Sequence, residues 1–420
     1  MIAVALWSLA LVFPALPSRV RSVRCCAAAD GERHAKWMHY ALHIAERGRL
    51  STAPNPWVGC VIVAADGVEI LAEGYHQRKG GKHAEAAALA DAVAKGVTRE
   101  QMEGATAYVT LEPCHRGPGK TTPPCDEALI SSGLRNVHVA IVDPDPSFGN
   151  AGVDHLRSHG VTVTVGTGSE AAALSLRPYL HQRRTKQPYV VLKVASAADG
   201  SIACADRTSQ WITGPAARAH SQMLRASSQA ILVGSGTALA DRPRLNVRLS
   251  ESELPDGWLM PSASLLRVVV DARGRVADGP LLDMAVAPTL IFTTSASRGT
   301  EARSAWEAAG VEVVEVPVSL AGSGSGVALD AVLTELGARG IIQVMVEGGG
   351  AVHGAFLGAT GCAQQLRLYI GATALGSSAT RWINAPLAST IEEAPRWKLL
   401  DVQQLGDDVC LDYSLDNDAD

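Results

Sequence analysis

The chain has 420 residues, 47% of them hydrophobic, a globular composition too long for one ordinary core, so we expect two domains. The formal net charge of −5 disfavours a broad nucleic-acid-binding face, which usually shows as a basic excess, and leaves any ligand phosphate to local Lys and Arg residues. Eight cysteines without regular spacing indicate a reducing compartment rather than a disulfide framework.

The first 29 residues differ in composition from the rest of the chain. They contain no Asp or Glu, and an apolar run at 2–13 precedes Arg19, Arg21 and Arg24. The apolar run is too short for a membrane span, so we interpret residues 1–29 as a targeting segment and expect no membrane contact in the mature protein. The alternative is a start codon placed too far upstream of a cytoplasmic protein.

A zinc-ligand pattern follows in the first half of the chain, where His83-Ala84-Glu85 precedes Pro113-Cys114 and then Cys125. A catalytic zinc takes three protein ligands and keeps one position for water. His83, Cys114 and Cys125 would be the ligands, and Glu85 would move protons between the activated water and the substrate as general acid and base. The pattern predicts zinc-dependent hydrolytic deamination.

Three secondary-structure elements are expected to bring these residues together. They are a helix over 82–94, with His83 and Glu85 in its first turn, a strand over 106–111 that ends before Cys114, and a helix over 124–132 that begins near Cys125. Each residue alone has a less specific interpretation, because Cys is often a small buried apolar residue and His a surface helix residue. A structural zinc would usually have four ligands and no spare carboxylate, so the combination favours a catalytic site.

Beyond residue 166 the pattern of the sequence changes. Residues 169–187 are helix-like and end in a basic cluster, so we expect a linker over 167–187. Continuous apolar runs then recur, which is typical of strands covered on both faces in an α/β domain with helical crossovers. The expected strands are 189–195, 230–234, 266–271, 289–293, 311–316 and 341–346, and 321–326 is expected to be a flexible loop.

A glycine-rich turn, Glu347-Gly348-Gly349-Gly350-Ala351, follows the last of these strands and precedes the helix-like segment 352–357. Glycines let the backbone approach a phosphate closely, and a helix N-terminus supplies N–H donors, so this turn could cradle an anion. An ordinary tight turn is the alternative. No Gly-x-Gly-x-x-Gly pattern follows the first strand of this half, so a standard dinucleotide fold is not indicated.

From residue 32 to about residue 411 the chain resembles the bifunctional deaminase/reductase family of riboflavin biosynthesis. The motifs that carry the deaminase half are Asn55-Pro56-Trp57-Val58-Gly59, Gly74-Tyr75-His76, His83-Ala84-Glu85 and the run 109–125. Ten residues separate Cys114 from Cys125, whereas the family pattern has about eight. The resemblance implies a cytidine-deaminase-like α/β/α zinc domain over 30–166 and a dihydrofolate-reductase-like α/β domain over 188–415.

The resemblance also implies binding residues in both halves. We expect Asn55 to position a pyrimidine ring, with His76 and Lys120 as candidates for its phosphate. In the second half, the implied substrate-binding residues are Lys193, Ser209, Arg225, Leu245, Arg248 and Glu347. The implied NADPH-binding residues are Ala195, Trp211, Thr237 and Asp241, with Gly349, Gly350, Ala351, Val352, His353, Gly354 and Ala355. A core aromatic is the alternative for Trp211, and a solvated helix face for each Arg.

The activity implied by the resemblance has two steps. A diaminopyrimidinone ribosylamino 5′-phosphate would be deaminated, and NADPH would then reduce its ribosyl group to a ribityl side chain. The resemblance further implies a homo-oligomer, and a plastid location in photosynthetic eukaryotes. The alternatives are a monofunctional deaminase with an inactive reductase-like domain, a non-catalytic scaffold, and a deaminase of nucleic acids or free nucleosides, for which the second half would have no purpose.

Overall fold

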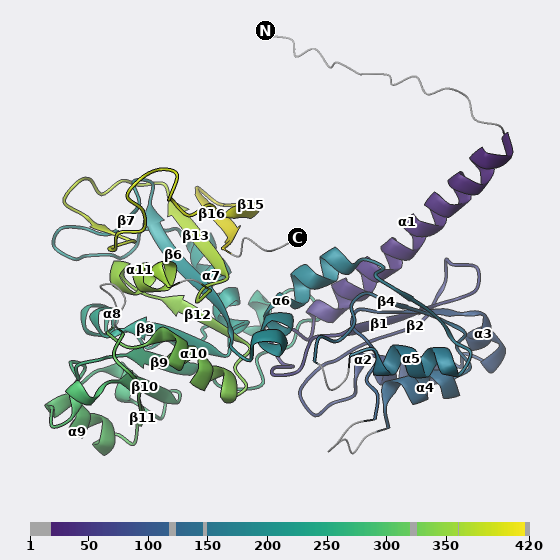
Figure 1. The fold of residues 1–420 in the computed structure, drawn as a ribbon, viewed down its shortest axis with the longest axis horizontal. Helices are drawn as coiled ribbons and strands as arrows, with labels where there is room; N and C mark the ends of the chain where they lie inside the picture. Colours follow the sequence, from purple (N-terminus) through teal and green to yellow (C-terminus); the bar gives the residue numbers. More distant parts are fainter. Residues whose placement is uncertain (1–17, 117–122, 146–148, 320–325, 360, 416–420) are drawn as a thin grey trace, which may run out of the picture.

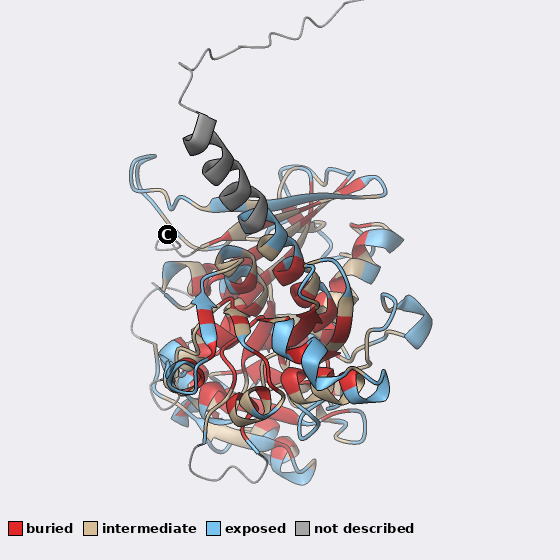
Figure 2. Ribbon diagram, turned by 90° about the vertical axis from the view of Figure 1, so that its right-hand side faces the viewer, coloured by how far each residue is buried: buried red, intermediate tan, exposed pale blue. Residues whose placement is uncertain are grey.

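The computed structural model describes the backbone of residues 18–116, 123–145, 149–319, 326–359 and 361–415, with side chains from residue 31 onward. It forms two α/β units side by side, and helix α6 (Ser169–Thr185) lies between their sheets (Figure 1). Buried residues fill the interior and exposed residues surround it (Figure 2). Lys120, residues 1–17 and most of the predicted flexible loop, 321–325, lie outside the described residues.

The N-terminal unit is a five-stranded sheet with helices on both faces. Its strand order is β2-β1-β3-β4-β5, in which β1 runs antiparallel to both neighbours and β3, β4 and β5 run parallel. Its elements are α1 (Ser18–Glu46), β1 (Gly59–Val63), β2 (Ile70–Tyr75), α2 (Ala84–Ala94), α3 (Arg99–Gly104), β3 (Thr106–Val109), α4 (Cys125–Ser131), β4 (Asn136–Val139), α5 (Ala151–Ser158), β5 (Thr162–Val165) and α6.

Alternation along β1 explains why helices cover both faces of this sheet. Cys60 and Ile62 pack into a core shared with α2, α4 and α5, whereas Val61 and Val63 pack into a core shared with α1 and α6. Since successive strand residues point to opposite faces, an apolar run such as this one must be covered on both sides. The predicted α/β/α arrangement is confirmed.

The C-terminal unit is built on a nine-stranded sheet with order β11-β10-β9-β8-β12-β6-β13-β16-β15. Its elements are β6 (Tyr189–Ala197), β7 (Ser201–Ala203), α7 (Pro215–Ala226), β8 (Ala230–Gly234), α8 (Ser235–Asp241), β9 (Leu266–Val270), β10 (Thr289–Thr293), α9 (Glu301–Ala308), β11 (Glu312–Glu315), α10 (Leu329–Ala338), β12 (Gln343–Glu347), α11 (Gly350–Gly358), β13 (Gln365–Gly371), β14 (Thr380–Arg381), β15 (Lys398–Leu405) and β16 (Asp408–Ser414), with short 3-10 turns η1 (Glu251–Glu253), η2 (Pro280–Leu282) and η3 (Ser295–Ser297).

The predicted strands of this unit are present, and each end lies within two residues of its predicted position. Together with β13 they form the parallel part of the sheet, with α10 and α11 on one face and α7, α8 and α9 on the other. The sequence pattern missed β13, β15 and β16. The last two run antiparallel at the sheet edge, where β16 alternates buried and half-buried residues and β15 is mostly exposed, so neither reads as a continuous apolar run.

The helices that carry the candidate site residues differ slightly from the predicted ones. His83 is the N-cap of α2, one residue before the helix, so Glu85 lies in the first turn but His83 does not. Pro124 caps α4, which makes Cys125 its first helical residue. The segment predicted at 352–357 is part of α11.

The segment expected to be a helix-like linker is α6, and it packs against residues of both units. Leu176 and Tyr179 share a core with Trp57 from the first unit and Ile342 from the second. The long connection before β9 also reaches back, since the Ser262 hydroxyl donates to the Ser51 carbonyl at 2.9 Å. The two units therefore meet through packed side chains as well as through the chain itself.

Helix α1 crosses the predicted end of the targeting segment. Its backbone begins at Ser18 and continues without interruption to Glu46, so residue 29 lies within a helix. Among the helices that the structure describes, none combines the length and apolarity needed to cross a bilayer.

Candidate active sites

The three predicted zinc ligands meet in the N-terminal unit. His83 caps α2, Cys125 opens α4, and Cys114 lies in the loop after β3. The Nδ1 atom of His83 lies 3.5 Å from the Sγ atoms of both Cys114 and Cys125. In a tetrahedral zinc site, neighbouring nitrogen and sulfur ligands are about 3.6 Å apart. The donor set and its spacing therefore fit a zinc ion.

The surroundings of these ligands favour a thiolate. The backbone N–H of Cys125 donates to Cys114 Sγ at 3.5 Å. The hydrogen bond with the Cys125 thiol, together with the contact with His83, lowers the pKa of Cys114 to about 3. Zinc binds deprotonated thiols, so this environment prepares one of the two sulfur ligands for the metal.

Glu85 lies in the first turn of α2, two residues beyond the His83 ligand, and its side chain is buried. Burial, with a further contribution from the charge of Cys114, raises the pKa of Glu85 to about 7. A carboxyl group with such a pKa can both accept and return a proton near neutral pH. The position next to the ligands is the one that the predicted acid/base role requires.

A cavity of about 260 Å³ opens onto the ligands and Glu85. Asn55 and His76 both line it, and Asn55 Nδ2 lies 3.2 Å from His76 Nε2. Because His76 Nδ1 faces the Lys82 carbonyl oxygen at 2.8 Å and must donate there, His76 Nε2 accepts from Asn55. Burial lowers the pKa of His76, which favours the neutral ring, and the contact of this ring with a phosphate stays a prediction.

Three further residues line this cavity that the sequence patterns did not indicate, namely Asp143, Tyr179 and Arg183. Tyr179 donates its hydroxyl hydrogen to Asp143 Oδ2 at 3.0 Å, and the Arg183 guanidinium lies 4.9 Å from the Tyr179 ring centre. Tyr179 and Arg183 come from α6. The basic cluster at the end of that helix was a signal for a ligand-binding cation, but it was interpreted as part of a linker.

In the C-terminal unit, two adjoining cavities of about 650 Å³ and 520 Å³ lie at the carboxyl ends of the parallel strands. Lys193, Trp211, Asp241 and Glu347 line both. Most residues predicted to bind NADPH line the larger cavity: Ala195, Trp211, Thr237, Asp241, Gly349, Gly350, Ala351, Val352 and His353. Arg225, Leu245 and Arg248, predicted to bind the substrate, line the smaller one.

Three predicted residues lie elsewhere than expected. Ser209, predicted for the substrate, lines the larger cavity with the cofactor residues. Gly354 and Ala355 line neither cavity, because they lie on buried sides of α11: a Cβ at Gly354 would lie 2.6 Å from the Cβ of Ala385, and Ala355 packs against the core. The glycine-rich turn therefore contributes its first residues, up to His353, to the cavity wall.

The glycine-rich turn is held in a narrow space at the start of α11. The Gly349 N–H donates to the Thr237 hydroxyl at 3.1 Å, which ties this turn to α8. A Cβ at Gly350 would lie 2.7 Å from the carbonyl oxygen of Arg381, so a larger residue would displace the backbone there. The N-terminus of α11 consequently faces the larger cavity with its N–H groups close to the surface.

An ion pair forms the wall between the two cavities. Arg225 donates to both carboxylate oxygens of Glu347 at 2.9 Å, and Lys193 Nζ lies 3.9 Å from Glu347 Oε1. Burial would raise the pKa of Glu347, but the charges of Lys193 and Arg225 outweigh it and hold that pKa below its usual value. Arg225, predicted to clamp a phosphate, is thus engaged with Glu347, whereas Arg248 is exposed.

Trp211 and Arg218 shape the open side of the larger cavity. The Trp211 side chain is 65% exposed, which rules out the alternative of a core aromatic. The Arg218 guanidinium lies 4.5 Å from its ring centre, and its Nη1 donates to the Thr213 carbonyl at 2.7 Å. An exposed indole held by a cation is available for stacking against a planar ligand.

Comparisons with known proteins agree with these two sites. Residues 31–141 match the family model of the cytidine and deoxycytidylate deaminase zinc-binding region, and residues 188–411 match that of the RibD C-terminal domain. The riboflavin biosynthesis protein RibD of Escherichia coli is 39% identical over 89% of this chain and 97% of its own length. RibD of Chlamydia trachomatis is 42% identical over 77% of this chain and 81% of its own length.

Solved structures give the same result over nearly the whole chain. Acinetobacter baumannii RibD is 36% identical, with a TM-score of 0.76 over 91% of this chain and 99% of that one. A Thermotoga maritima diaminohydroxyphosphoribosylaminopyrimidine deaminase/5-amino-6-(5-phosphoribosylamino)uracil reductase is 30% identical, with a TM-score of 0.76 over 92% and 99%. The resemblance inferred from the motifs is confirmed. The chain belongs to the RibD family of riboflavin biosynthesis and combines a zinc-binding deaminase domain with an NADPH-dependent reductase domain.

Proposed function

We propose that the zinc pocket deaminates a diaminopyrimidinone ribosylamino 5′-phosphate and that the second domain reduces the ribosyl group of the product to a ribityl side chain. One observation carries the first step: His83, Cys114 and Cys125 converge within ligand distance beside the buried carboxyl of Glu85. The cavity of about 260 Å³ opens onto these groups, which gives a pyrimidine ring access to them, and Arg183 lies in the same lining.

In this proposal the residues of the zinc pocket have separate tasks. His83, Cys114 and Cys125 hold the zinc ion, which when bound activates a water molecule for attack on the amino-bearing pyrimidine carbon. Glu85 takes a proton from the attacking water and returns it to the departing ammonia. Asn55, oriented by its hydrogen bond to His76, positions the ring. Arg183, at the end of α6, meets the phosphate from the cavity lining.

In the second domain, NADPH supplies the hydride, and the protein aligns the donor with the sugar. The larger cavity would hold NADPH, since the N–H groups at the N-terminus of α11 could bind phosphates and Trp211 could stack against a planar ring. The substrate occupies the smaller cavity, with Arg248 as phosphate ligand. Lys193 and Glu347, which border both cavities, contact the sugar, and Arg225 fixes the Glu347 carboxylate.

A two-step assay with metal analysis tests this function. The purified protein should contain zinc, release ammonia from the diaminopyrimidinone phosphate, and oxidise NADPH only after deamination. Removal of the metal with a chelator should abolish ammonia release and leave NADPH oxidation intact when the deaminated intermediate is supplied. Ammonia release without subsequent NADPH oxidation would instead indicate a monofunctional deaminase, for which neither the comparisons nor the cavities give support.

Three further proposals concern the whole protein. Residues 1–29 act as a targeting segment, with the deaminase domain over 30–166, the linker over 167–187 and the reductase domain over 188–415. A plastid location rests on the acid-poor composition of the first segment alone, since the relatives named above are bacterial.

Fractionation of cells that express the full chain, with a variant lacking residues 1–29 as control, distinguishes this location from a cytoplasmic one. Sedimentation analysis tests the proposed homo-oligomer.

A further inference from the structure

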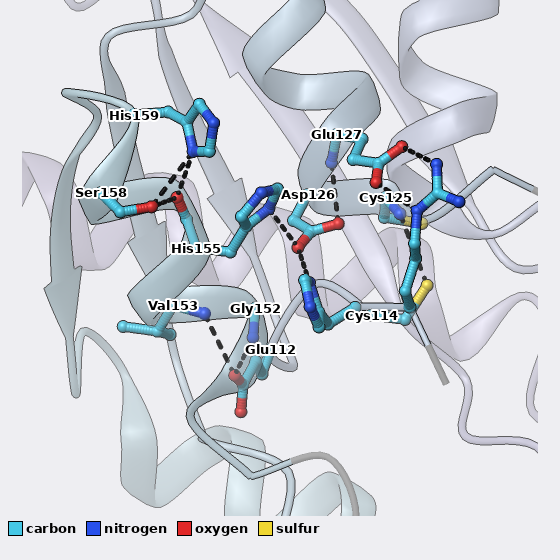
Figure 3. A network of polar contacts seen from close by, with 12 residues as sticks. Glu112, Cys114, Cys125, Asp126, Glu127, Gly152, Val153, His155, Ser158 and His159 are labelled. Atoms are coloured by element: carbon cyan, nitrogen blue, oxygen red, sulfur yellow. Dashed lines mark hydrogen bonds and ion pairs between the residues drawn. The ribbon is translucent and has the colours of Figure 1, made fainter. Parts of the chain in front are cut away.

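A second group of potential metal ligands lies beside the zinc pocket and takes no part in the proposed reaction. The Asp126 side chain is completely buried. Its Oδ2 atom lies 2.5 Å from His115 Nδ1 and 2.8 Å from His155 Nδ1. All three ligand atoms lie within 4.8 Å of one another. Figure 3 shows Asp126 between His155 and the pair Cys114 and Cys125.

Two members of this cluster directly follow zinc ligands in the sequence. His115 follows Cys114, and Asp126 follows Cys125 at the start of α4. Successive residues of a helix project about 100° apart, so Asp126 and Cys125 can serve different centres from adjacent positions. Each end of the loop between Cys114 and Cys125 therefore carries one zinc ligand and one residue of the second cluster, and this loop is longer than the family pattern.

The third member comes from α5, whose position is fixed independently. Glu112 Oε1 accepts from the N–H groups of Gly152 and Val153 at 3.0 and 3.1 Å, which caps the start of α5. A Cβ at Gly152 would lie 2.0 Å from the Pro113 carbonyl oxygen, so α5 begins in direct contact with the segment before Cys114. His155 follows about one turn later and is held over Asp126. The cluster is therefore preorganised from three anchored segments.

The charge and surroundings of the cluster also suit a cation. Asp126 contributes a carboxylate oxygen to the cluster and the two histidines contribute ring nitrogens, all of which are atoms that bind cations. The adjacent Arg116 does not neutralise the Asp126 carboxylate, because its guanidinium pairs with Glu127 at 2.6 and 3.0 Å. Asp126 Oδ1 accepts from the Glu127 N–H at 2.8 Å, an outer hydrogen bond that orients the carboxylate. The His115 and His155 side chains are 30% and 24% exposed, so an ion could enter from solvent.

A hydrogen-bonded network is the alternative, in which Asp126 only accepts N–H groups from two imidazoles. A carboxylate has two oxygens for such bonds, yet both rings aim at the same one. The two ring nitrogens and the carboxylate oxygen lie within 4.8 Å of one another, close enough to bind a single ion. A bound ion would spread these atoms to about 3.3 Å apart, a shift that partly exposed rings can make.

We propose that His115, Asp126 and His155 form a second binding site for a divalent transition-metal ion such as Zn²⁺, distinct from the catalytic zinc. Two imidazoles and one carboxylate are ligands that suit Zn²⁺ and Co²⁺ rather than Mg²⁺ or Ca²⁺. The bound ion joins the Cys114 to Cys125 loop, at both its ends, to α5. Its role is to hold the loop that carries two catalytic ligands.

Cobalt titration of the metal-free full-length protein tests this site, because the two centres differ in sulfur. We expect two equivalents of Co²⁺ to bind. The centre at Cys114 and Cys125 gives thiolate-to-cobalt charge-transfer absorption, whereas the second centre, with nitrogen and oxygen ligands, gives ligand-field absorption without it. If the wild-type protein shows the ligand-field absorption of the second centre but no charge-transfer band, the proposed deaminase site is contradicted and the second site is still supported.

Variants then assign the second equivalent. His155→Gln should bind one equivalent and keep the charge-transfer band, which also shows that the fold around the thiols is intact. His159→Gln is the matched control, since its ring lies 4.4 Å from that of His155 but outside the cluster, and it should bind two. Asp126→Asn provides a second loss variant of the same shape. One equivalent in the wild type, or two in both loss variants, would overturn the proposal.

Discussion

The two candidate active sites differ in how much of the chemistry the protein itself supplies. The zinc pocket has a volume of about 260 Å³, and its three predicted ligands and predicted acid/base residue come from one 43-residue stretch, 83–125. The reductase cavities are larger, about 650 and 520 Å³, and take their walls from residues spread between Lys193 and Thr380. The first site assembles reactive groups, whereas the second shapes a space for a cofactor that brings its own reactivity.

This difference predicts how each site tolerates change. A pocket that depends on one carboxyl group for proton transfer should fail almost completely when that group is replaced. The reductase cavities have many lining residues, so a single substitution there should reduce activity only in part. The largest loss is expected when the ion pair between Arg225 and Glu347 is broken. Four experiments examine this contrast, in order of decreasing expected effect.

The largest effect is expected for Glu85→Gln. Deamination should fall on the order of 10³-fold, because the amide cannot move the proton, while zinc content stays unchanged. NADPH oxidation with the deaminated intermediate should equal that of the wild type, measured in the same preparation. Glu103→Gln, an exposed residue of α3, is the control. A loss of less than tenfold would assign the acid/base role to another group.

Glu347→Gln should lower the stability of the reductase domain by about 3 kcal/mol, because it leaves the largely buried Arg225 without its charged partner. Reduction should fall with it, whereas ammonia release should not change. The matched control is Glu315→Gln, which breaks exposed pairs with Arg298 and Arg303 and should have a much smaller effect on stability. Denaturant unfolding measures the stability of each variant, and assays of reduction and of ammonia release measure its two activities. Equal effects from the two variants would contradict a central role for the buried pair.

Acid should weaken the reductase domain through His353. Burial lowers the pKa of His353 to about 4. Between that value and the usual pKa of about 6.5, the unfolded chain binds a proton that the folded domain does not. The contribution to stability is therefore full above about pH 6.5 and decreases as the pH falls toward 4. Unfolding measured across this pH range should show that the decrease in stability is smaller in His353→Leu by on the order of 2 kcal/mol. In the control His159→Gln, the decrease should match that of the wild type.

The smallest effect is expected for Arg183→Gln at the zinc pocket. Loss of one charged hydrogen bond to the substrate phosphate should raise KM about tenfold and leave kcat nearly unchanged. Arg184→Gln provides the control, because Arg184 is the exposed neighbour on α6 and does not line the cavity. Reductase activity should stay the same in both variants. If kcat falls instead of KM rising, Arg183 acts on the reacting groups rather than on the phosphate.

The two sites also differ in how far the sequence alone predicted them. The juxtaposition of His83, Cys114 and Cys125 near Glu85 was predictable because their spacing within one short stretch is itself a chemical pattern, and their roles stay predictions. The continuous apolar strands of the second domain were predictable because burial on both faces leaves a clear signature. Arg183 and Tyr179 were missed, since they reach the pocket from a helix far along the chain. The engagement of Arg225 by Glu347 was also missed, because no pattern in one sequence shows which opposite charges will meet.

Helix α6 has a practical consequence for dividing this protein into halves. Tyr179 and Arg183 form part of the wall of the zinc pocket, and a few residues later the same stretch of chain enters β6, which carries Lys193 to the other cavity. A fragment cut at residue 166 would retain every metal ligand and yet open its substrate chamber to water on one side. A fragment intended to contain only the deaminase domain should therefore end after residue 185. An insertion meant to separate the two domains should also lie after residue 185.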